Sequence, residues 1–378
     1  MFGFFSFYSF LIIALTILYG IYDYRGKEEF KERSFYLGCF VLLFFAASRG
    51  ESVGGDLAEY IPLFHGLNDS SITEIFMTSL MSGYEIGFVL LCKLINLISD
   101  ESRFFIIVTS ICSLLGPFFL VVRYSENKWY SILMYPLLSF YTISLNNVRQ
   151  AIAISIIMFA IHFLLQQRKL SFLCCVVIAS FMHTSAVFSL LFYPLTRWQY
   201  SFKKVVFLIT SLLVVFFLLG SFLFNYMLAN VFTRYLNETG DSYTETGTGY
   251  GLLVVYIFIV AICLVLFQKG YADMDSQSYN INKLFLLSVI AAVFIQAFAS
   301  YMAALSRLVY YFYLPIIVLL PNLIGNIRKT PVRRLLFIAM FLFFYGLASF
   351  TFLSPVGESG MNSTDTIPYV FLNGVFSW

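Results

Sequence analysis

Long runs of apolar residues, separated by short polar segments, recur from one end of the chain to the other. As a helix, a run of about 20 apolar residues can cross the roughly 30 Å hydrocarbon core of a bilayer. The runs lie at residues 4–22, 35–48, 86–98, 104–122, 129–145, 148–165, 170–193, 205–225, 250–267, 284–304, 308–325 and 335–351. The pattern predicts an all-α polytopic membrane protein with about 10–12 transmembrane helices, re-entrant segments included.

Composition agrees with this class, because 60% of the residues are hydrophobic and only 11% are charged. A water-soluble domain could not hide that much apolar surface. The net charge of +3 and the absence of a basic cluster argue against a nucleic-acid partner. The first apolar run lacks a basic region before it and a small-residue cleavage site after it, so we expect a retained anchor. Without a repeat or a linker, we expect one integral membrane domain over 1–378.

Basic residues gather in some of the polar segments and are missing from others. Since Lys and Arg mark cytoplasmic loops, we expect residues 25–33, 198–204, 268–283 and 328–334 to be cytoplasmic. The segments 49–85, 225–248 and 354–378 are then external.

Two arrangements of the helices fit this distribution. If every run crosses the membrane, Arg149 lies on the cytoplasmic side. If 86–98 and 170–193 are re-entrant or interfacial, Arg149 faces outward and more of the Lys and Arg residues lie inside. The polar break that begins at His183 favours the second arrangement, because interrupted helices are tolerated at membrane depth where they line protein or water.

Three arginines stand at or near external ends of apolar runs: Arg49, Arg149 and Arg307. Any one of them could simply extend its charge to the lipid head groups. The alternative is a clamp for phosphate, since a guanidinium offers a planar fork of donors and keeps its charge. We expect these three residues to bind such a group.

Candidate bases for acid–base chemistry are the carboxylates of Asp56, Glu59 and Glu85 in the external segment, and His183 within an apolar run. Solvated loop carboxylates and a structural histidine are the simpler interpretations. Asp56, Glu85 and His183 stay open as alternatives for one catalytic role. All six cysteines lie in apolar runs without ligand spacing, so we expect no metal.

Five segments, in this order, resemble the EpsG-type Wzy family, the bacterial polymerases of O-antigen and capsular polysaccharide. They are Arg49 followed by Val-Gly-x-Asp at 53–56, Glu-x-Gly-Phe at 85–88, Arg-Gln-x-x-Ala at 149–153 with His-x-Ser-Ala at 183–186, SRLVYYF at 306–312, and IPYVF at 367–371. Gly55 departs from the pattern, because a hydroxyl residue is common there.

The resemblance implies a GT-C-like fold and a glycosyltransferase of the inner membrane. Such an enzyme transfers a growing glycan from undecaprenyl pyrophosphate to the next lipid-linked repeat unit at the external face, without a cofactor or a metal. Donor and acceptor oligosaccharides, membrane lipids, a chain-length regulator and a flippase are the implied partners. Direct displacement by the acceptor hydroxyl would invert the anomeric centre. Residues expected to contact substrate are Tyr60, Gln150, Tyr311 and Tyr369.

Two other functions fit the same apolar pattern. An O-antigen ligase has similar helices and the same donor, but normally a larger external loop than residues 225–248. A flippase for lipid-linked oligosaccharides is the non-enzymatic alternative, and it favours repeated halves and a basic central cavity.

Overall fold

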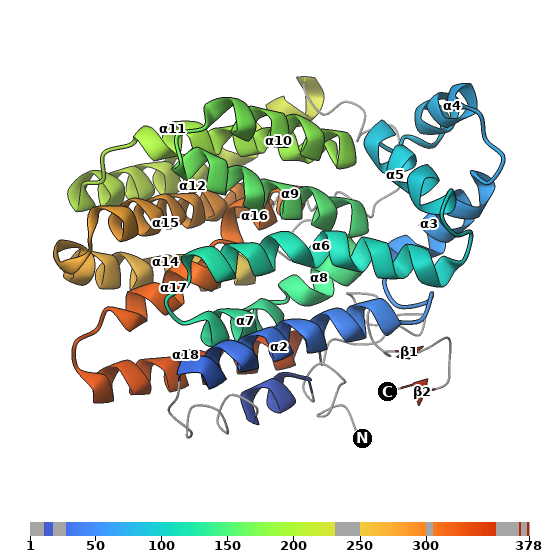
Figure 1. The fold of residues 1–378 in the computed structure, drawn as a ribbon. Helices are drawn as coiled ribbons and strands as arrows, with labels where there is room; N and C mark the ends of the chain where they lie inside the picture. The colour runs from blue at the N-terminus through green and yellow to red at the C-terminus, as the bar shows by residue number, and fades with distance from the viewer. Residues whose placement is uncertain are drawn as a thin grey trace. The chain divides into compact units, whose positions relative to one another are not determined.

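The computed structural model describes residues 11–17, 28–230, 250–299, 305–352, 370–371 and 376–377. These residues are mostly helical (Figure 1). Within this described part of the chain, the only strands are β1 (Val370–Phe371) and β2 (Phe376–Ser377), which pair antiparallel. The predicted all-α class is confirmed.

Packing divides the chain into two compact units. The first contains Met1–Val187 and Arg328–Trp378, and the second contains Phe188–Ile327. This division concerns packing alone, and the single functional domain expected over 1–378 stays a prediction.

The first unit is a set of helices in which α9 packs against both α6 and α10 (Figure 1). Its helices are α2 (Glu28–Ser48), α3 (Gly55–Gly66), α4 (Ile72–Ser82), α5 (Ile86–Asn96), α6 (Ser102–Tyr124), α7 (Lys128–Leu137), α8 (Phe140–Asn146), α9 (Val148–Leu165), α10 (Lys169–Met182) and α18 (Thr330–Phe352). Small residues allow close approach, as is usual in membranes. The Gly116 N–H of α6 donates to Ser155 Oγ of α9 at 2.8 Å, and an added Cβ at Gly116 would overlap the α9 backbone.

The chain enters the second unit through the 3₁₀ helix η1 (Thr184–Leu191). The elements that follow are α11 (Phe192–Arg197), α12 (Phe202–Asn230), α14 (Tyr250–Gly270), η3 (Tyr271–Asp273), α15 (Ser276–Ala299), α16 (Ser306–Tyr313) and α17 (Ile316–Gly325). Two buried amides join α15 to α17, since Asn322 Nδ2 donates to Asn282 Oδ1 at 3.2 Å. Such a bond ties two apolar helices in one register.

Six helical segments of the described residues are long and apolar enough to cross a membrane: Ser102–Tyr124, Val148–Leu165, Tyr250–Asp273, Ser276–Ala299, Ser306–Gly325 and Thr330–Ser349. Helices α5 and α10 have 11 and 14 residues. At about 1.5 Å per residue, neither spans a bilayer alone. Helix α10 stops at the predicted break, where His183 is extended. The short helices agree with the second arrangement of the spans, while the orientation itself stays a prediction.

One predicted run differs from the structure. Residues 129–145 form two helices, α7 and α8, instead of one span. Pro136 lies at the end of α7, and Ser139 has φ +61, a left-handed conformation that no helix continues through. The predicted run 308–325 has a short interruption at Pro315, between α16 and α17, but lies within one segment, Ser306–Gly325, that is long enough to cross a membrane.

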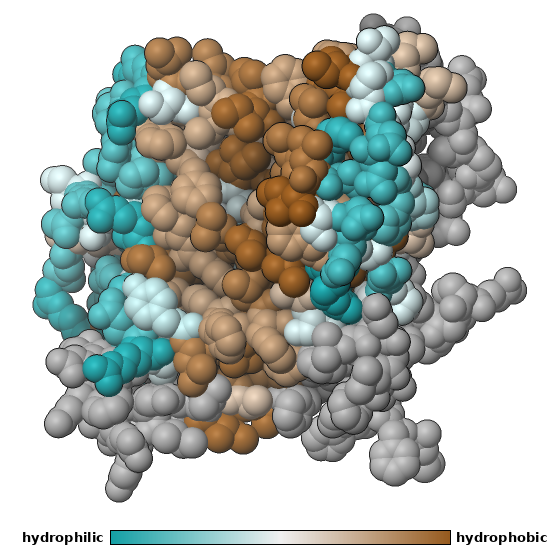
Figure 2. Space-filling model, turned by 45° about the vertical axis from the view of Figure 1, so that its right-hand side comes forward, coloured by the Kyte–Doolittle hydropathy of each residue, from teal (hydrophilic) through white to brown (hydrophobic). Residues whose placement is uncertain are grey.

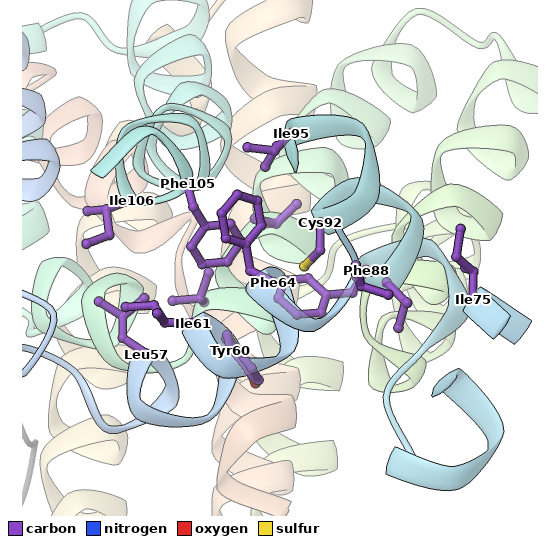
Figure 3. Packing of buried hydrophobic residues seen from close by; sticks show 14 residues of the cluster. Leu57, Tyr60, Ile61, Phe64, Ile75, Phe88, Cys92, Ile95, Phe105 and Ile106 are labelled. Carbon is purple, nitrogen blue, oxygen red and sulfur yellow. The ribbon is translucent and has the colours of Figure 1, made fainter. Parts of the chain in front are cut away.

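The segment 49–85, predicted to be external, is also more ordered than its polar sequence suggests, because it folds into α3 and α4. A cluster of buried apolar side chains holds these helices and α5 against α6 and α9 (Figure 3). Phe64 of α3, Phe88 of α5 and Phe105 of α6 are completely buried within it. This cluster fixes where the polar side chains of α3 and α5 lie.

Candidate functional site

The beginning of α9 is the place where segments distant in sequence meet. The first N–H groups of a helix lack acceptors within the helix. One of them, the N–H of Val148, donates to Asp56 Oδ2 of α3 at 3.0 Å. Asp56 therefore caps α9 from another helix, and its negative charge lies at the positive end of the helix dipole.

A tight turn brings Asp56 to this position. Gly54 has φ +99, and an added Cβ there would overlap the carbonyl oxygen of Leu145. Only glycine suits both conditions. The next N–H, that of Gly55, donates to Asn146 Oδ1 at 2.8 Å. The Val-Gly-x-Asp segment thus serves to dock α3 on the junction of α8 and α9.

Arg149 follows Val148, and its guanidinium is held on several sides. Its Nε donates to Tyr60 Oη at 2.6 Å, and its Nη1 lies 2.5 Å from Glu85 Oε2. The Arg149 Cζ lies 4.6 Å from the ring centre of Tyr84 and 6.0 Å from that of Phe88. Cation–π contacts and a charge-assisted bond together fix the plane of the guanidinium. Within the described residues, the Nη2 group makes no hydrogen bond, so its two N–H donors are available.

Glu85 precedes the first residue of α5 and joins Arg149 to the end of α10. Its second oxygen, Oε1, accepts from His183 Nδ1 at 3.1 Å. The same oxygen accepts from the Thr184 N–H at 2.9 Å and the Thr184 hydroxyl at 3.0 Å. With the bond from Arg149, the carboxylate has about the four partners it can accept.

Burial of Glu85 opposes its ionisation, but the hydrogen bond from His183 and the charge of Arg149 outweigh burial. They lower the pKa of Glu85 to about 2. At neutral pH this side chain is a carboxylate that is fully engaged by donors. It is therefore suited to orienting its neighbours and poorly suited to taking a further proton.

His183 lies at the interruption between α10 and η1, where its backbone is extended. Because the Glu85 carboxylate only accepts, the neutral imidazole carries its proton on Nδ1, and Nε2 keeps the lone pair. Nε2 makes no hydrogen bond in the part of the chain that the structure describes. The His183 side chain is 17% exposed. Since Glu85 already accepts several hydrogen bonds and Asp56 caps α9, His183 is the candidate whose basic nitrogen makes no hydrogen bond among the described residues.

Two tyrosines complete this cluster, which we call the Arg149 cluster: Arg149, Glu85, His183, Thr184, Tyr60 and Tyr84. The Tyr84 hydroxyl donates to Glu59 Oε2 at 2.8 Å, and burial and this bond raise the pKa of Tyr84 to about 12. Burial and the charge of Asp56 raise the pKa of Tyr60 as well. Both phenols therefore keep their protons. The sequence did not single out Tyr84 or Thr184, although each lies beside a residue of the motifs.

Some predicted substrate residues are buried. Tyr60 is 1% exposed and contacts Arg149 through its hydroxyl, so its ring has no open face. Gln150 and Tyr311 are buried too. Direct contact of these three side chains with a sugar stays a prediction, and it would require that they be uncovered. Tyr369 lies outside the described residues.

The other two arginines, Arg49 and Arg307, lie outside α9, the helix that carries Arg149. Arg49 is 1% exposed, with Nη1 at 3.5 Å from Ser110 Oγ, so phosphate binding by its side chain would require it to move. Arg103 Nη1 donates a hydrogen bond to the Arg49 carbonyl oxygen at 2.7 Å and so caps the end of α2. The sequence alone did not predict this cap. Arg307 is exposed on α16, in the second unit. Its cooperation with Arg149 stays a prediction.

Among the described residues, no three His, Cys, Asp or Glu side chains gather as a metal site requires. The Arg149 cluster instead offers fixed positive charge, a hydrogen-bonded carboxylate and a basic nitrogen. These groups can bind an anion and accept a proton beside it.

Comparison with known proteins gives one match. The model of the EpsG family matches residues 32–371, which is most of the chain and includes all the residues of the Arg149 cluster. No curated protein and no solved structure matches the chain significantly.

Proposed function

Because the chain belongs to the EpsG family, we propose that it is a polysaccharide polymerase of the bacterial inner membrane. It transfers a growing glycan from undecaprenyl pyrophosphate to a lipid-linked repeat unit at the external face, in the synthesis of O-antigen, capsule or exopolysaccharide. The observation that carries the proposal is that Glu85 contacts both Arg149 and His183. One carboxylate thus fixes an anion-binding group and a base side by side.

Arg149 is the group we assign to the pyrophosphate of the donor. Its Nε and Nη1 are held by Tyr60 and Glu85, which leaves the donors of Nη2 to an incoming oxygen. Negative charge grows on the pyrophosphate as its bond to the sugar breaks. A guanidinium already fixed in place stabilises that charge without reorganisation, which lowers the barrier.

His183 is the group we assign to the acceptor sugar. Its Nε2 takes the proton of the attacking hydroxyl, while the hydroxyl oxygen forms the new bond to the anomeric carbon. The bond from that carbon to the phosphate oxygen breaks, and undecaprenyl pyrophosphate leaves with the electron pair. The Glu85 carboxylate stabilises the imidazolium that results, as a carboxylate does in hydrolase triads. A single displacement of this kind inverts the anomeric centre and needs no metal.

The roles of Arg49 and Arg307 belong to the proposal as further pyrophosphate contacts. Each would act from its own place: Arg49 from the α2–α6 contact, and Arg307 from the second unit. Arg307→Lys in the polymer assay tests the second of these roles separately from Arg149.

The test is polymer length in cells that lack the chromosomal gene and carry plasmid variants. Lysine keeps the charge but not the fork of donors, so Arg149→Lys should reduce polymer to near the single-repeat product. Loss of one such donor costs about 10²–10³ in rate. The matched control is Arg168→Lys, an exposed arginine just beyond the opposite end of α9.

Outcomes for other functions differ visibly. Lipid-linked polymer that accumulates unattached in the deletion strain would indicate a ligase. Repeat units that never reach the external face would indicate a flippase. Normal polymer length with Arg149→Lys, at normal protein abundance, would contradict the proposed clamp.

A further inference from the structure

Helix α4 leaves one side of its surface apolar and uncovered. Five large apolar side chains of this helix are each at least 51% exposed: Ile72, Phe76, Met77, Leu80 and Met81. At 100° per residue they occupy about half of the helix circumference, and Thr73 of the first turn is the one polar residue among them. The only buried residue of α4 is Ile75, on the opposite side, where it packs into the apolar cluster of α3, α5 and α6 (Figure 3).

This helix has defined ends, so its apolar side is a fixed surface. Ser71 and Glu74 form a reciprocal capping box at its beginning. Gly83 ends it with φ +70, the left-handed conformation typical of a helix end. The Ser79 hydroxyl also donates to the Tyr84 carbonyl at 2.6 Å, which ties the last turn to the next segment.

The apolar side of α4 continues into surfaces of neighbouring helices. Helix α4 packs on α5, and α5 packs on α6, which is long enough to cross a membrane. Leu94 of α5 is exposed, as are Leu97 and Ile98 just after its end. On α6, Ile111 and Leu115 are exposed. Figure 1 shows α3, α4 and α5 together near one end of α6. Figure 2 shows a face on which apolar side chains form a broad band with polar ones at its edges.

We propose that α4 is an interfacial helix whose apolar side enters the acyl chains of the lipid leaflet next to the Arg149 cluster. The partner is membrane lipid, because the surface is continuous with that of a membrane-spanning helix. A helix of this kind is buried about 5–10 Å into the boundary between head groups and acyl chains. Glu74, Thr78 and Ser82 lie away from the apolar side and form the polar side.

The position of α4 has a direct consequence for the Arg149 cluster. Only Gly83 and Tyr84 separate α4 from Glu85, and the bond from Ser79 to Tyr84 spans this short link. A helix anchored in the interface therefore sets the depth of Glu85 at the level of the lipid head groups. The inference about lipid contact does not depend on the proposed reaction.

Tryptophan fluorescence in vesicles tests this directly. Leu80→Trp and Ser82→Trp place the probe at exposed positions two residues apart, and hence on opposite sides of α4. The full-length protein is reconstituted into phosphatidylcholine vesicles with plain or brominated acyl chains. Subtracting the emission of the unsubstituted chain, which has three tryptophans, isolates the introduced one.

We expect brominated lipid to remove most of the emission of Leu80→Trp and to leave that of Ser82→Trp nearly unchanged. Acrylamide in the water should quench the two in the opposite order. Phe76→Trp repeats the measurement with an aromatic-for-aromatic exchange, should Leu80→Trp not fold. Quenching of the Leu80→Trp and Phe76→Trp probes by acrylamide but not by lipid, or by neither, would overturn the proposal. Equal lipid quenching of Leu80→Trp and Ser82→Trp would overturn it as well.

Discussion

The carboxylate of Asp56 accepts a hydrogen bond from the N–H of Val148, which lies 92 positions later in the chain. Asp56 therefore fixes the beginning of the helix that carries Arg149. Its place in the sequence suggested a catalytic base, whereas its contact is that of a helix cap.

Exchange of Asp56 separates these two roles. Asparagine also caps helices well, while alanine loses the cap at a cost of about 0.5–2 kcal/mol. We expect Asp56→Asn to retain polymer synthesis within a few-fold, and Asp56→Ala to lower the thermal stability of the purified protein. Complete loss of polymer with Asp56→Asn, at normal abundance, would restore Asp56 as a candidate base.

Glu85→Gln should be much more damaging. A glutamine amide must turn its NH₂ group toward either Arg149 or the donors of His183 and Thr184. Two hydrogen-bond donors then face each other on that side, and the hydrogen bond is lost. The imidazole also loses its orientation, and general-base catalysis contributes about 10²–10⁴ in rate. We expect a loss of this order in polymer formed per mole of purified enzyme.

The matched control for Glu85→Gln is Glu74→Gln. Glu74 is the exposed glutamate of the capping box of α4, and glutamine serves in that position too. Glu74→Gln should retain nearly full activity. Similar losses for both variants would mean that the effect of Glu85→Gln is not specific to the Arg149 cluster.

The pKa of Glu85 also predicts how stability depends on pH. Its value of about 2 in the folded protein is below the ordinary value of about 4.3. The stabilisation from ionised Glu85 is therefore fully present above about pH 4.3 and is lost as the pH falls toward 2. We expect the difference in melting temperature between wild type and Glu85→Gln to be constant from neutral pH to about pH 5, and to shrink below that. Shrinkage already near neutral pH would mean that Glu85 titrates there.

Gly54→Ala tests the turn that docks α3. The alanine Cβ would overlap the Leu145 carbonyl, and the positive φ adds strain. We expect lower abundance, a lower melting temperature and shorter polymer. The control is Gly66→Ala at the end of α3, where an added Cβ meets nothing within 4 Å. Equal stability of the two variants would contradict the described turn.

Much of the fold and part of the cluster could be predicted from the sequence. Apolar runs revealed the membrane helices, and the polar break at His183 revealed an interrupted one. Arg149, Glu85 and His183 were named in advance, and the structure brings them together. The pattern could not assign their roles, because Asp56 and Glu85 are both carboxylates of one predicted external segment. They differ in the donors that the folded chain brings to them.

Other features depend on tertiary contacts that leave no local signal. The cap that Arg103 gives to α2 requires α6 to lie beside it. Tyr60 is buried because α3 packs against its neighbours. The sequence alone suggested a loop at this position, where a tyrosine would be accessible to substrate. Helix α4 was not predicted, because it lies in the segment 49–85, whose carboxylates indicated only an external location.

The interruption at His183 also affects how natural variation in this protein should be interpreted. Glu85 accepts the Thr184 N–H, a backbone donor at the beginning of η1 that has no acceptor within a helix. If Glu85 acts as proposed, we expect a substitution there to lower both the rate of polymer formation and the stability of the protein. Arg149→Lys keeps a positive charge beside Glu85, so we expect it to reduce polymer formation with less effect on protein abundance. A natural variant with lysine at this position should therefore persist in the membrane as full-length protein, whereas variants at Glu85 should be found at lower abundance.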